Sequence, residues 1–358
     1  MDATALAALL QAVQTNCHIA DARHAGDLTL CTYLLQMREF HRWERALPYG
    51  AALAQASVGA WIAEREALWD GLADRDPTPL PLPGGGQADP FEVERINGAL
   101  RPAGLLYGAG LVGTDRPVFF LAERHAEGRR EGLPVHVAGR ELARGLLAPV
   151  AVLDGAGDPP AIVLRRESLA RWCWERFEAF RHRPSDTSPF HAVVRAYRLD
   201  EDFTAALPRW LDEQGEAAVL HELGEATVGR RLGPGWGDMR LALPTRRGAL
   251  YAAAVRDLLA DLQVTLPTLL ARDAAASIHV WFAQFDGVRA VLAPALPPAY
   301  AAWRAGDGGA ALRRAIVAGR AHVARLADAV LRLHDHGGPS AGPVIEQLLQ
   351  SPQAVWSA

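Results

Sequence analysis

The sequence predicts an α+β protein that is mainly α-helical, with a small antiparallel β-sheet in the middle of the chain. Three observations support this prediction. Apolar residues recur at helical spacing toward both ends, short apolar runs broken by turn residues fill residues 104–166, and a stretch rich in proline and glycine precedes those runs. With 358 residues, 50% of them hydrophobic, the chain can bury a large core in two domains or in one elaborated domain.

The first 75 residues are expected to form an N-terminal helical unit. The first helix is identified by apolar residues at helical spacing: Leu6, Leu9, Leu10 and Val13. Two further runs, at 27–45 and 61–72, predict two more helices. Residues 74–90 then contain five prolines and three consecutive glycines. Because such a stretch disfavours regular structure, we expect a linker at residues 76–95.

Residues 96–166 are expected to form a small β-rich unit. Five apolar runs predict its strands: Leu105–Val112, Val118–Ala122, Val135–Ala138, Val150–Leu153 and Ala161–Leu164. The segment Gly113–Pro117 between the first two runs has the composition of a hairpin turn. These features predict an antiparallel sheet or a partial barrel.

Residues 167–358 are expected to form a C-terminal helical unit. Its strongest helical runs lie at 168–180, 205–231, 249–262 and 310–334. In the last run, apolar residues alternate spacings of four and three, which predicts a stripe that faces a core: Leu312, Ile316, Gly319, Val323, Leu326, Val330 and Leu333.

The chain contains no lysine, since all 37 of its basic residues are arginine. This absence excludes every reaction that depends on a lysine side chain: a Schiff base, a phosphate-loop lysine or a lysine general base. The glycine-rich stretches also match no phosphate-binding fingerprint, so nucleotide binding is not expected.

The overall charge and hydropathy predict a soluble protein without nucleic-acid or membrane partners. The net charge is -4, the arginines are scattered, and no run approaches the roughly 20 apolar residues that span a bilayer. Three widely spaced cysteines, Cys17, Cys31 and Cys173, suit neither a disulfide framework nor a thiolate zinc site. We therefore expect a cytoplasmic protein with reduced cysteines. Its partner, a small molecule or a protein, is left open.

The most informative segment is His221–Glu225, which the sequence places on a helix. It is similar to the helix motif of zinc proteases, with the second histidine replaced by Glu225. Residues four apart on a helix lie about 40° apart around its axis, so His221 and Glu225 can reach one ion. The ion would be zinc, iron or manganese, and Glu222 would be a general base or a carboxylate that supports the ligands.

The change to glutamate weakens the protease interpretation, and a metal site also needs a third ligand. No glutamate occurs from 230 to 345, so the following helices offer only five candidates: Asp238, Asp257, Asp261, His279 and His322. The alternative is a salt-bridged helix face, in which Glu222 and Glu225 pair with Arg230, Arg231 or an arginine of another helix.

A second charged segment lies near the N-terminus, where His24 and Asp27 precede an apolar helix that carries Glu39. Buried charges must be paired or bound, so these three residues are candidate metal ligands. We favour instead an internal salt-bridge network, with Arg38 or Arg42 as partners. A di-iron helical bundle is disfavoured, because the chain has no Glu-x-x-His spacing.

The segments 21–27, 37–39 and 220–225 resemble sequences of an uncharacterised bacterial protein family. The resemblance carries no activity, cofactor or fold. It suggests that the N-terminal and central segments belong to one functional unit.

Two functions follow from these patterns. The first is a metal-dependent enzyme, hydrolytic or oxidative, with His221 and Glu225 as ligands and with His24, Asp27 or Glu39 as a contribution from the N-terminal segment. The second is a non-catalytic helical protein that binds another protein or has a structural role, and whose charged motifs are internal ion pairs. A shared site requires the N-terminal side chains to lie within about 5 Å of His221 and Glu225, a span that one ion bridges.

Overall fold

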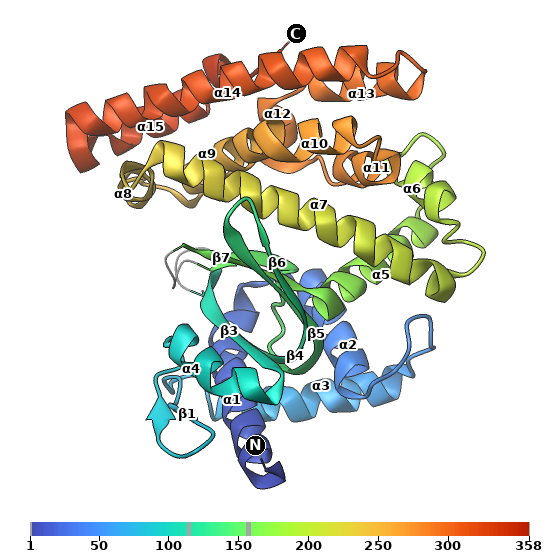
Figure 1. Ribbon diagram of the computed structural model, residues 1–358, viewed down its shortest axis with the longest axis vertical. Helices are drawn as coiled ribbons and strands as arrows, with labels where there is room; N and C mark the ends of the chain where they lie inside the picture. Colours follow the sequence, from blue (N-terminus) through green and yellow to red (C-terminus); the bar gives the residue numbers. More distant parts are fainter. Residues whose placement is uncertain (1, 113–115, 155–158, 358) are drawn as a thin grey trace. The chain divides into compact units, whose positions relative to one another are not determined.

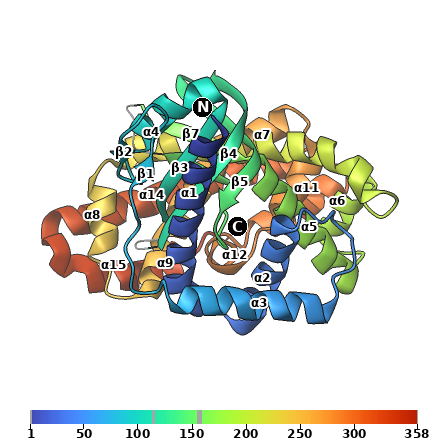
Figure 2. The ribbon, with the colours of Figure 1, turned by 90° about the horizontal axis from the view of Figure 1, so that it is seen from below.

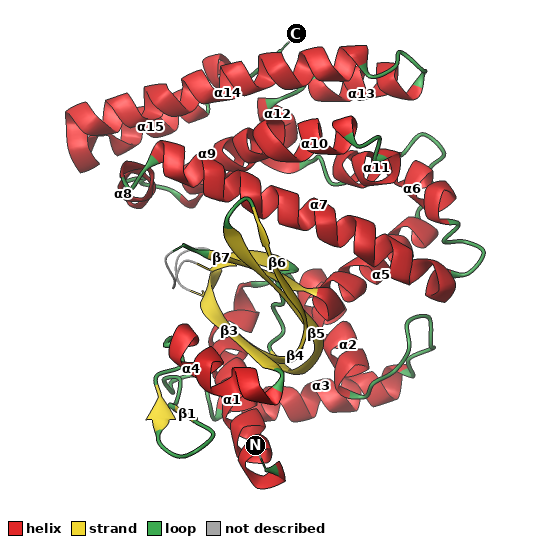
Figure 3. Ribbon diagram, viewed as in Figure 1, coloured by secondary structure: helices red, strands yellow, loops and turns green. Residues whose placement is uncertain are grey.

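The computed structural model describes residues 2–112, 116–154 and 159–357 (Figure 1). It contains two compact units, Met1–Glu175 and Arg176–Ala358, and the boundary falls within helix α5 (Arg166–His182). Helices account for 64% of the structure and a five-stranded sheet occupies residues 105–165, so the expected α+β class is confirmed (Figure 3). No helix among the described residues is long and apolar enough to cross a membrane.

The first unit combines helices with both sheets of the protein. Its helices are α1 (Ala3–His24), α2 (Leu30–Glu44), α3 (Gln55–Asp70), α4 (Val93–Leu100) and the first part of α5. The larger sheet contains β3 (Leu105–Val112), β4 (Arg116–Arg130), β5 (Leu133–Arg144), β6 (Ala151–Asp154) and β7 (Ala161–Arg165). All five expected strands are present, and β4 and β5 extend well beyond the apolar runs that predicted them.

The larger sheet has the strand order β3-β4-β5-β7-β6 and is curled. Neighbouring strands are antiparallel except β5 and β7. Strand β7 lies between β5 and β6, and it runs parallel to β5 and antiparallel to β6. Val112 of β3 faces Arg116 of β4 in the register. Residues 113–115 of the expected hairpin turn lie outside the described part of the chain.

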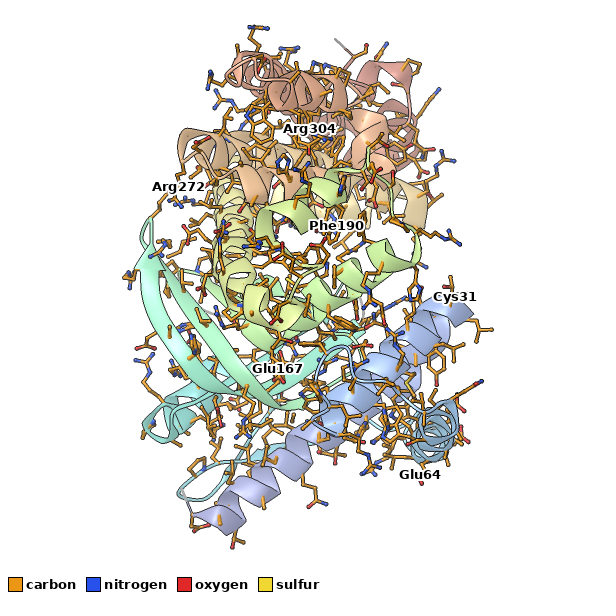
Figure 4. The ribbon with its side chains drawn as sticks, turned by 90° about the vertical axis from the view of Figure 1, so that its right-hand side faces the viewer. Cys31, Glu64, Glu167, Phe190, Arg272 and Arg304 are labelled. Atoms are coloured by element: carbon orange, nitrogen blue, oxygen red, sulfur yellow. The ribbon has the colours of Figure 1, made fainter. Side chains whose placement is uncertain are left out.

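Helix α1 packs on the sheet and forms the main core of the first unit (Figure 2). Its buried residues Leu9 and Val13 belong to one apolar cluster with Tyr107 of β3 and Leu121 of β4. A second cluster joins α2 and α3, with Phe40 and Trp61 at its centre. All three cysteines are free: Cys17 and Cys173 are buried, and Cys31 is exposed (Figure 4).

Residues 76–95, which we expected as a linker, contain a two-stranded sheet and the start of α4. Strands β1 (Leu80–Pro81) and β2 (Gln87–Ala88) pair antiparallel. The side chains of Leu80 and Ala88 are buried in the same cluster as α1. The division of the chain into four parts, 1–75, 76–95, 96–166 and 167–358, stays a prediction.

The described residues of the second unit form helices joined by loops, with no strand among them. Its elements are α6 (Pro189–Tyr197), α7 (Phe203–Leu232), α8 (Gly235–Leu241), α9 (Arg246–Ala260), a π-helical turn (Asp261–Thr265), α10 (Leu266–Ala271), α11 (Ala275–Ala283), α12 (Gly287–Leu292), α13 (Leu296–Arg304), α14 (Ala310–Gly337) and α15 (Gly342–Leu349). Six of the seven residues of the expected stripe on α14 are buried, from Leu312 to Val330.

Candidate metal centre

Helix α7 carries the central motif. Its N-terminus is capped by Asp202, whose carboxylate accepts a hydrogen bond from the backbone N–H of Ala205 at 3.0 Å. The helix is 30 residues long and ends at Gly233, whose positive φ of 68° suits glycine. One face of the helix enters the core through Leu220 and Leu223, so His221 and Glu225 lie side by side at its edge.

Two aspartates, one at the end of α9 and one just after it, complete the site. Asp257 belongs to the last turn of α9, and Asp261 is the first residue of the π-helical turn that follows. These aspartates are also four residues apart, so each of the two segments contributes a pair of side chains from one face. Both were among the five residues that the sequence offered as a third ligand.

Gly224 lets α7 and α9 approach closely. A Cβ atom added at Gly224 would lie 2.7 Å from the backbone oxygen of Ala260, which no real side chain tolerates. The two helices therefore touch through their backbones at the level of the motif. This contact brings His221 to Asp261 and Glu225 to Asp257.

The four side chains form a compact cluster. His221 Nδ1 lies 2.8 Å from Asp261 Oδ1, and His221 Nε2 lies 3.6 Å from Glu225 Oε1. One ligand atom each of His221, Glu225 and Asp257 lies within 4.8 Å of the other two. These atoms are two carboxylate oxygens and an imidazole nitrogen, a donor set that zinc, iron and manganese all accept.

The charges of the cluster are strongly coupled. Burial alone would lower the pKa of His221, but the Asp261 carboxylate and the hydrogen bonds to Asp261 and Glu225 together raise it well above its ordinary value. Burial and the neighbouring Glu225 raise the pKa of Asp257. A divalent cation bound here would change the protonation and the contacts of three groups: the neighbouring carboxyls of Glu225 and Asp257, and the charged imidazole of His221.

An arginine that the sequence did not single out competes for Glu225. Arg256 Nη2 lies 2.7 Å from both carboxylate oxygens of Glu225. Arg289 Nη1 approaches Asp261 Oδ2 at 3.5 Å. Only one feature of the sequence pointed to Arg256, which is that it directly precedes the candidate ligand Asp257.

Glu222 lies next to the cluster on the buried side of α7. Only 8% of its surface is exposed. Burial raises the pKa of Glu222 to about 7, against the opposing effect of the His221 charge. A carboxyl group with this pKa can both accept and release a proton near neutral pH.

The N-terminal candidates lie in the first unit. His24 Nδ1 is 3.4 Å from Asp27 Oδ2, and Asp27 also pairs with Arg116 at 3.2 Å. Glu39 is buried between Arg38 and Arg42, at 2.9 and 3.0 Å. The contacts of Glu39 are those of the salt-bridge network that we favoured, whereas Asp27 pairs with Arg116 of β4, which the sequence did not offer as a partner. Its contribution to a metal site with His221 stays a prediction.

Two histidines that the sequence offered as a third ligand have other partners. His279 Nδ1 lies 2.8 Å from the hydroxyl of Tyr300, and burial lowers the pKa of His279 to about 4. His322 Nε2 lies 3.2 Å from the backbone oxygen of Ala354. Asp238 lies on α8 and does not belong to the cluster.

The chain is a two-domain protein, and family models match both of its halves. The model of the N-terminal domain of a family of unknown function (DUF6866) matches residues 8–165, and the model of the C-terminal domain matches residues 170–352. The chain belongs to this family, and the expected resemblance to a family without a known activity is confirmed. No curated protein and no solved structure matches the chain.

Proposed function

We propose that this protein is a metal-dependent enzyme, hydrolytic or oxidative, whose divalent ion is held by His221, Glu225 and Asp257. One observation carries the proposal. The buried Asp261 binds Nδ1 of His221, which leaves Nε2 facing Glu225, in one cluster with Asp257. Histidine ligands of metals almost always donate their other ring nitrogen to a carboxylate or carbonyl in this way.

The protein side chains have distinct roles in this proposal. Three protein ligands leave coordination positions open, which is the pattern of catalytic rather than structural sites. A bound divalent ion would supply a Lewis acid and an activated water or oxygen. Glu222, whose pKa burial raises to about 7, would hold or release the proton beside it. About a third of the His221 and Asp257 side chains is exposed, which gives a substrate access.

The alternative is a non-catalytic helical protein in which this cluster is an internal ion-pair network. The pairing of Arg256 with Glu225 favours it, because a guanidinium already neutralises one proposed ligand. Under this alternative, the three acidic groups of the cluster and His221 would only fix the packing of α7 against α9.

Elemental analysis separates the two proposals. We expect about one zinc, iron or manganese ion per chain in untagged protein purified aerobically or anaerobically, and none in the His221→Ala variant. His191→Ala is the matched control, since this histidine lies on α6 and pairs with the exposed Asp186. A full metal content in His221→Ala would exclude this site. A metal-free wild type under both conditions would favour the ion-pair network.

The Arg256→Gln variant provides a second, independent test. If a metal binds, removing the competing cation leaves metal affinity unchanged or higher, and added metal raises the melting temperature. If the network is purely structural, the variant loses about 1 to 3 kcal/mol and added metal restores none of it, because the partly buried Glu225 stays unpaired. The cytoplasmic location expected from the sequence stays a prediction.

A further inference from the structure

A second site is suggested by a cavity of about 600 Å³ within the first unit. It lies between α2, the loop that follows α2, the end of β5 and the start of α5. Four arginines line it: Arg42, Arg140, Arg144 and Arg171. Its volume falls in the range of small-molecule sites, about 300 to 1,000 Å³.

Arg144, at the end of β5, is the most unusual of these residues. Its side chain is 1% exposed, yet its Nη2 atom has no hydrogen-bond partner in the described parts of the chain. Its Nε donates to the backbone oxygen of Gly145 at 3.3 Å, and its Nη1 lies 3.8 Å from Glu141 Oε2, beyond hydrogen-bond distance. A buried charged donor without a partner costs stability unless a ligand satisfies it.

Arg171 on α5 repeats the pattern. It is 8% exposed, and its terminal nitrogens bind Gln36, Glu175 and the backbone oxygen of Ala148. Its Nε has no hydrogen-bond partner among the residues that the structure describes. Arg144 and Arg171, which both line the cavity, thus each retain one unused donor.

The lining of the cavity carries four arginines and four glutamates, Glu39, Glu44, Glu141 and Glu167. Protein donors already engage two buried carboxylates: Arg38 and Arg42 pair with Glu39, and Arg165 and Ser168 bind Glu141 Oε1. An anion would therefore be held by the unused donors of Arg144 and Arg171, not by a surplus of positive charge.

Burial shifts the ionisation of two groups that line the cavity. Burial, together with the like charge of Arg171, lowers the pKa of Arg144 to about 10. Burial, together with the like charge of Glu141, raises the pKa of Glu167, which lies where α5 begins (Figure 4). Both shifts favour the neutral form, which is the usual effect of removing a charged group from water.

We propose that this cavity binds a small organic molecule through a terminal oxyanion, a carboxylate or a phosphoryl group, which accepts a hydrogen bond from Arg144 Nη2 and is held by the charge of Arg171. An oxyanion offers several lone pairs to guanidinium donors, and such charge-assisted bonds are among the strongest in proteins. The remaining volume is bordered by Trp43, whose ring lies 5.3 Å from the Arg144 guanidinium. This indole suits a planar or apolar body attached to the oxyanion.

Binding can be measured on the full chain with simple probes. Inorganic phosphate, phenyl phosphate and benzoate are titrated at constant ionic strength, with chloride as the reference anion, and followed by melting temperature and calorimetry. We expect phenyl phosphate or benzoate to bind more tightly than chloride. Preference for the first identifies a phosphoryl ligand, and preference for the second identifies a carboxylate.

Variants then locate the binding. Arg144→Gln should weaken the preferred probe by about tenfold or more, and Arg171→Gln should weaken it as well. Arg95→Gln is the control, because this arginine of α4 is half exposed and pairs with Glu92 on the surface. Without probe, Arg144→Gln should melt at the wild-type temperature or higher, since it removes a buried guanidinium that has an unused donor.

Three results would overturn the proposal. The first is that no probe stabilises the wild type more than chloride does. The second is that Arg144→Gln and Arg95→Gln bind the probe equally well. The third is that Arg144→Gln lowers the melting temperature without changing affinity, which is the behaviour of a structural arginine. If Arg144→Gln does not fold, Arg171→Gln is compared with Arg95→Gln in the same way.

Discussion

His221 Nδ1 lies 2.8 Å from Oδ1 of Asp261, and this contact determines which ring nitrogen of His221 is free for a ligand. The Asp261 side chain is 1% exposed and is held at the first residue of a π-helical turn. Because Nδ1 is engaged, Nε2 is the atom that faces Glu225, at 3.6 Å. Four predictions follow from this arrangement and its surroundings.

Replacing Asp261 with asparagine should weaken metal binding by about 10- to 100-fold, because the carboxylate that orients the metal-binding His221 loses its negative charge. Asp238→Asn on α8 is the control and should leave affinity unchanged. Competition with a chromogenic chelator measures both variants. Equal affinity in the two would show that Asp261 does not orient a ligand.

Gly224→Ala should lower the free energy of unfolding by about 1 to 3 kcal/mol, because the added Cβ would meet the backbone of Ala260 at 2.7 Å and force α7 away from α9. Gly229→Ala, on the same helix, meets no atom within 4 Å and should stabilise the protein by about 0.5 to 1 kcal/mol. Urea unfolding compares the two. Only Gly224→Ala should also reduce metal content, and a similar loss in both variants would contradict the packing argument.

The pH dependence of stability should reverse when metal is added. In the metal-free protein the pKa of His221 is raised above 6.5, so its contribution to stability is full below pH 6.5 and is lost as the pH rises through the folded value. Burial would raise the pKa of Asp261, but His221 lowers it below 3.8, so its contribution is lost as the pH falls through the folded value. The pair should therefore stabilise the metal-free protein most between about pH 4 and 6.5.

A metal ion must displace the proton of His221, so the increase in melting temperature caused by metal should grow from pH 6 to pH 8. Melting curves across this range, with and without added zinc or manganese, give both slopes. A metal effect that is constant with pH would indicate binding at a site without histidine.

Glu222→Gln should stabilise the protein at pH 8 and have little effect at pH 5. The folded pKa of Glu222 is about 7 against an ordinary 4.5, so the folded state loses stability as the pH rises from about 4.5 to about 7. A glutamine lacks this penalty, and the difference should reach about 1 to 3 kcal/mol. Thermal unfolding at the two pH values measures it, with Glu216→Gln on the same helix as the control for a lost charge. A glutamine variant that is less stable at pH 8 would show that the carboxylate is required for packing.

Much of the fold could be predicted because its signals are local. The bounds of β3, Leu105–Val112, match the apolar run that predicted them, and the stripe on α14 follows directly from its spacing. The length of β5 could not be predicted. The last four residues of β5 include Glu141 and Arg144, which are both buried. A strand buries charged side chains only when residues distant in the sequence pair with them.

The candidate site was predictable only in part, for a related reason. The spacing of His221 and Glu225 on one helix is a local property, whereas the choice of Asp257 and Asp261 among five candidates depends on how α9 packs against α7. That packing requires a residue without a side chain at position 224. In the sequence, Gly224 cannot be distinguished from any other glycine. The competing pair of Arg256 with Glu225 depends on the same contact.

The π-helical turn at Asp261–Thr265 determines how the buried face of α10 is rotated relative to that of α9. Such a turn is an α-helix with one residue inserted. Deleting one residue there would restore a regular helix and rotate every following side chain by about 100°. Leu266 and Leu269, now buried, would turn out of the core, whereas Asp257 would keep its place before the turn. Homologues of this chain should therefore tolerate insertions and deletions in the loop before α9 far better than within these five residues.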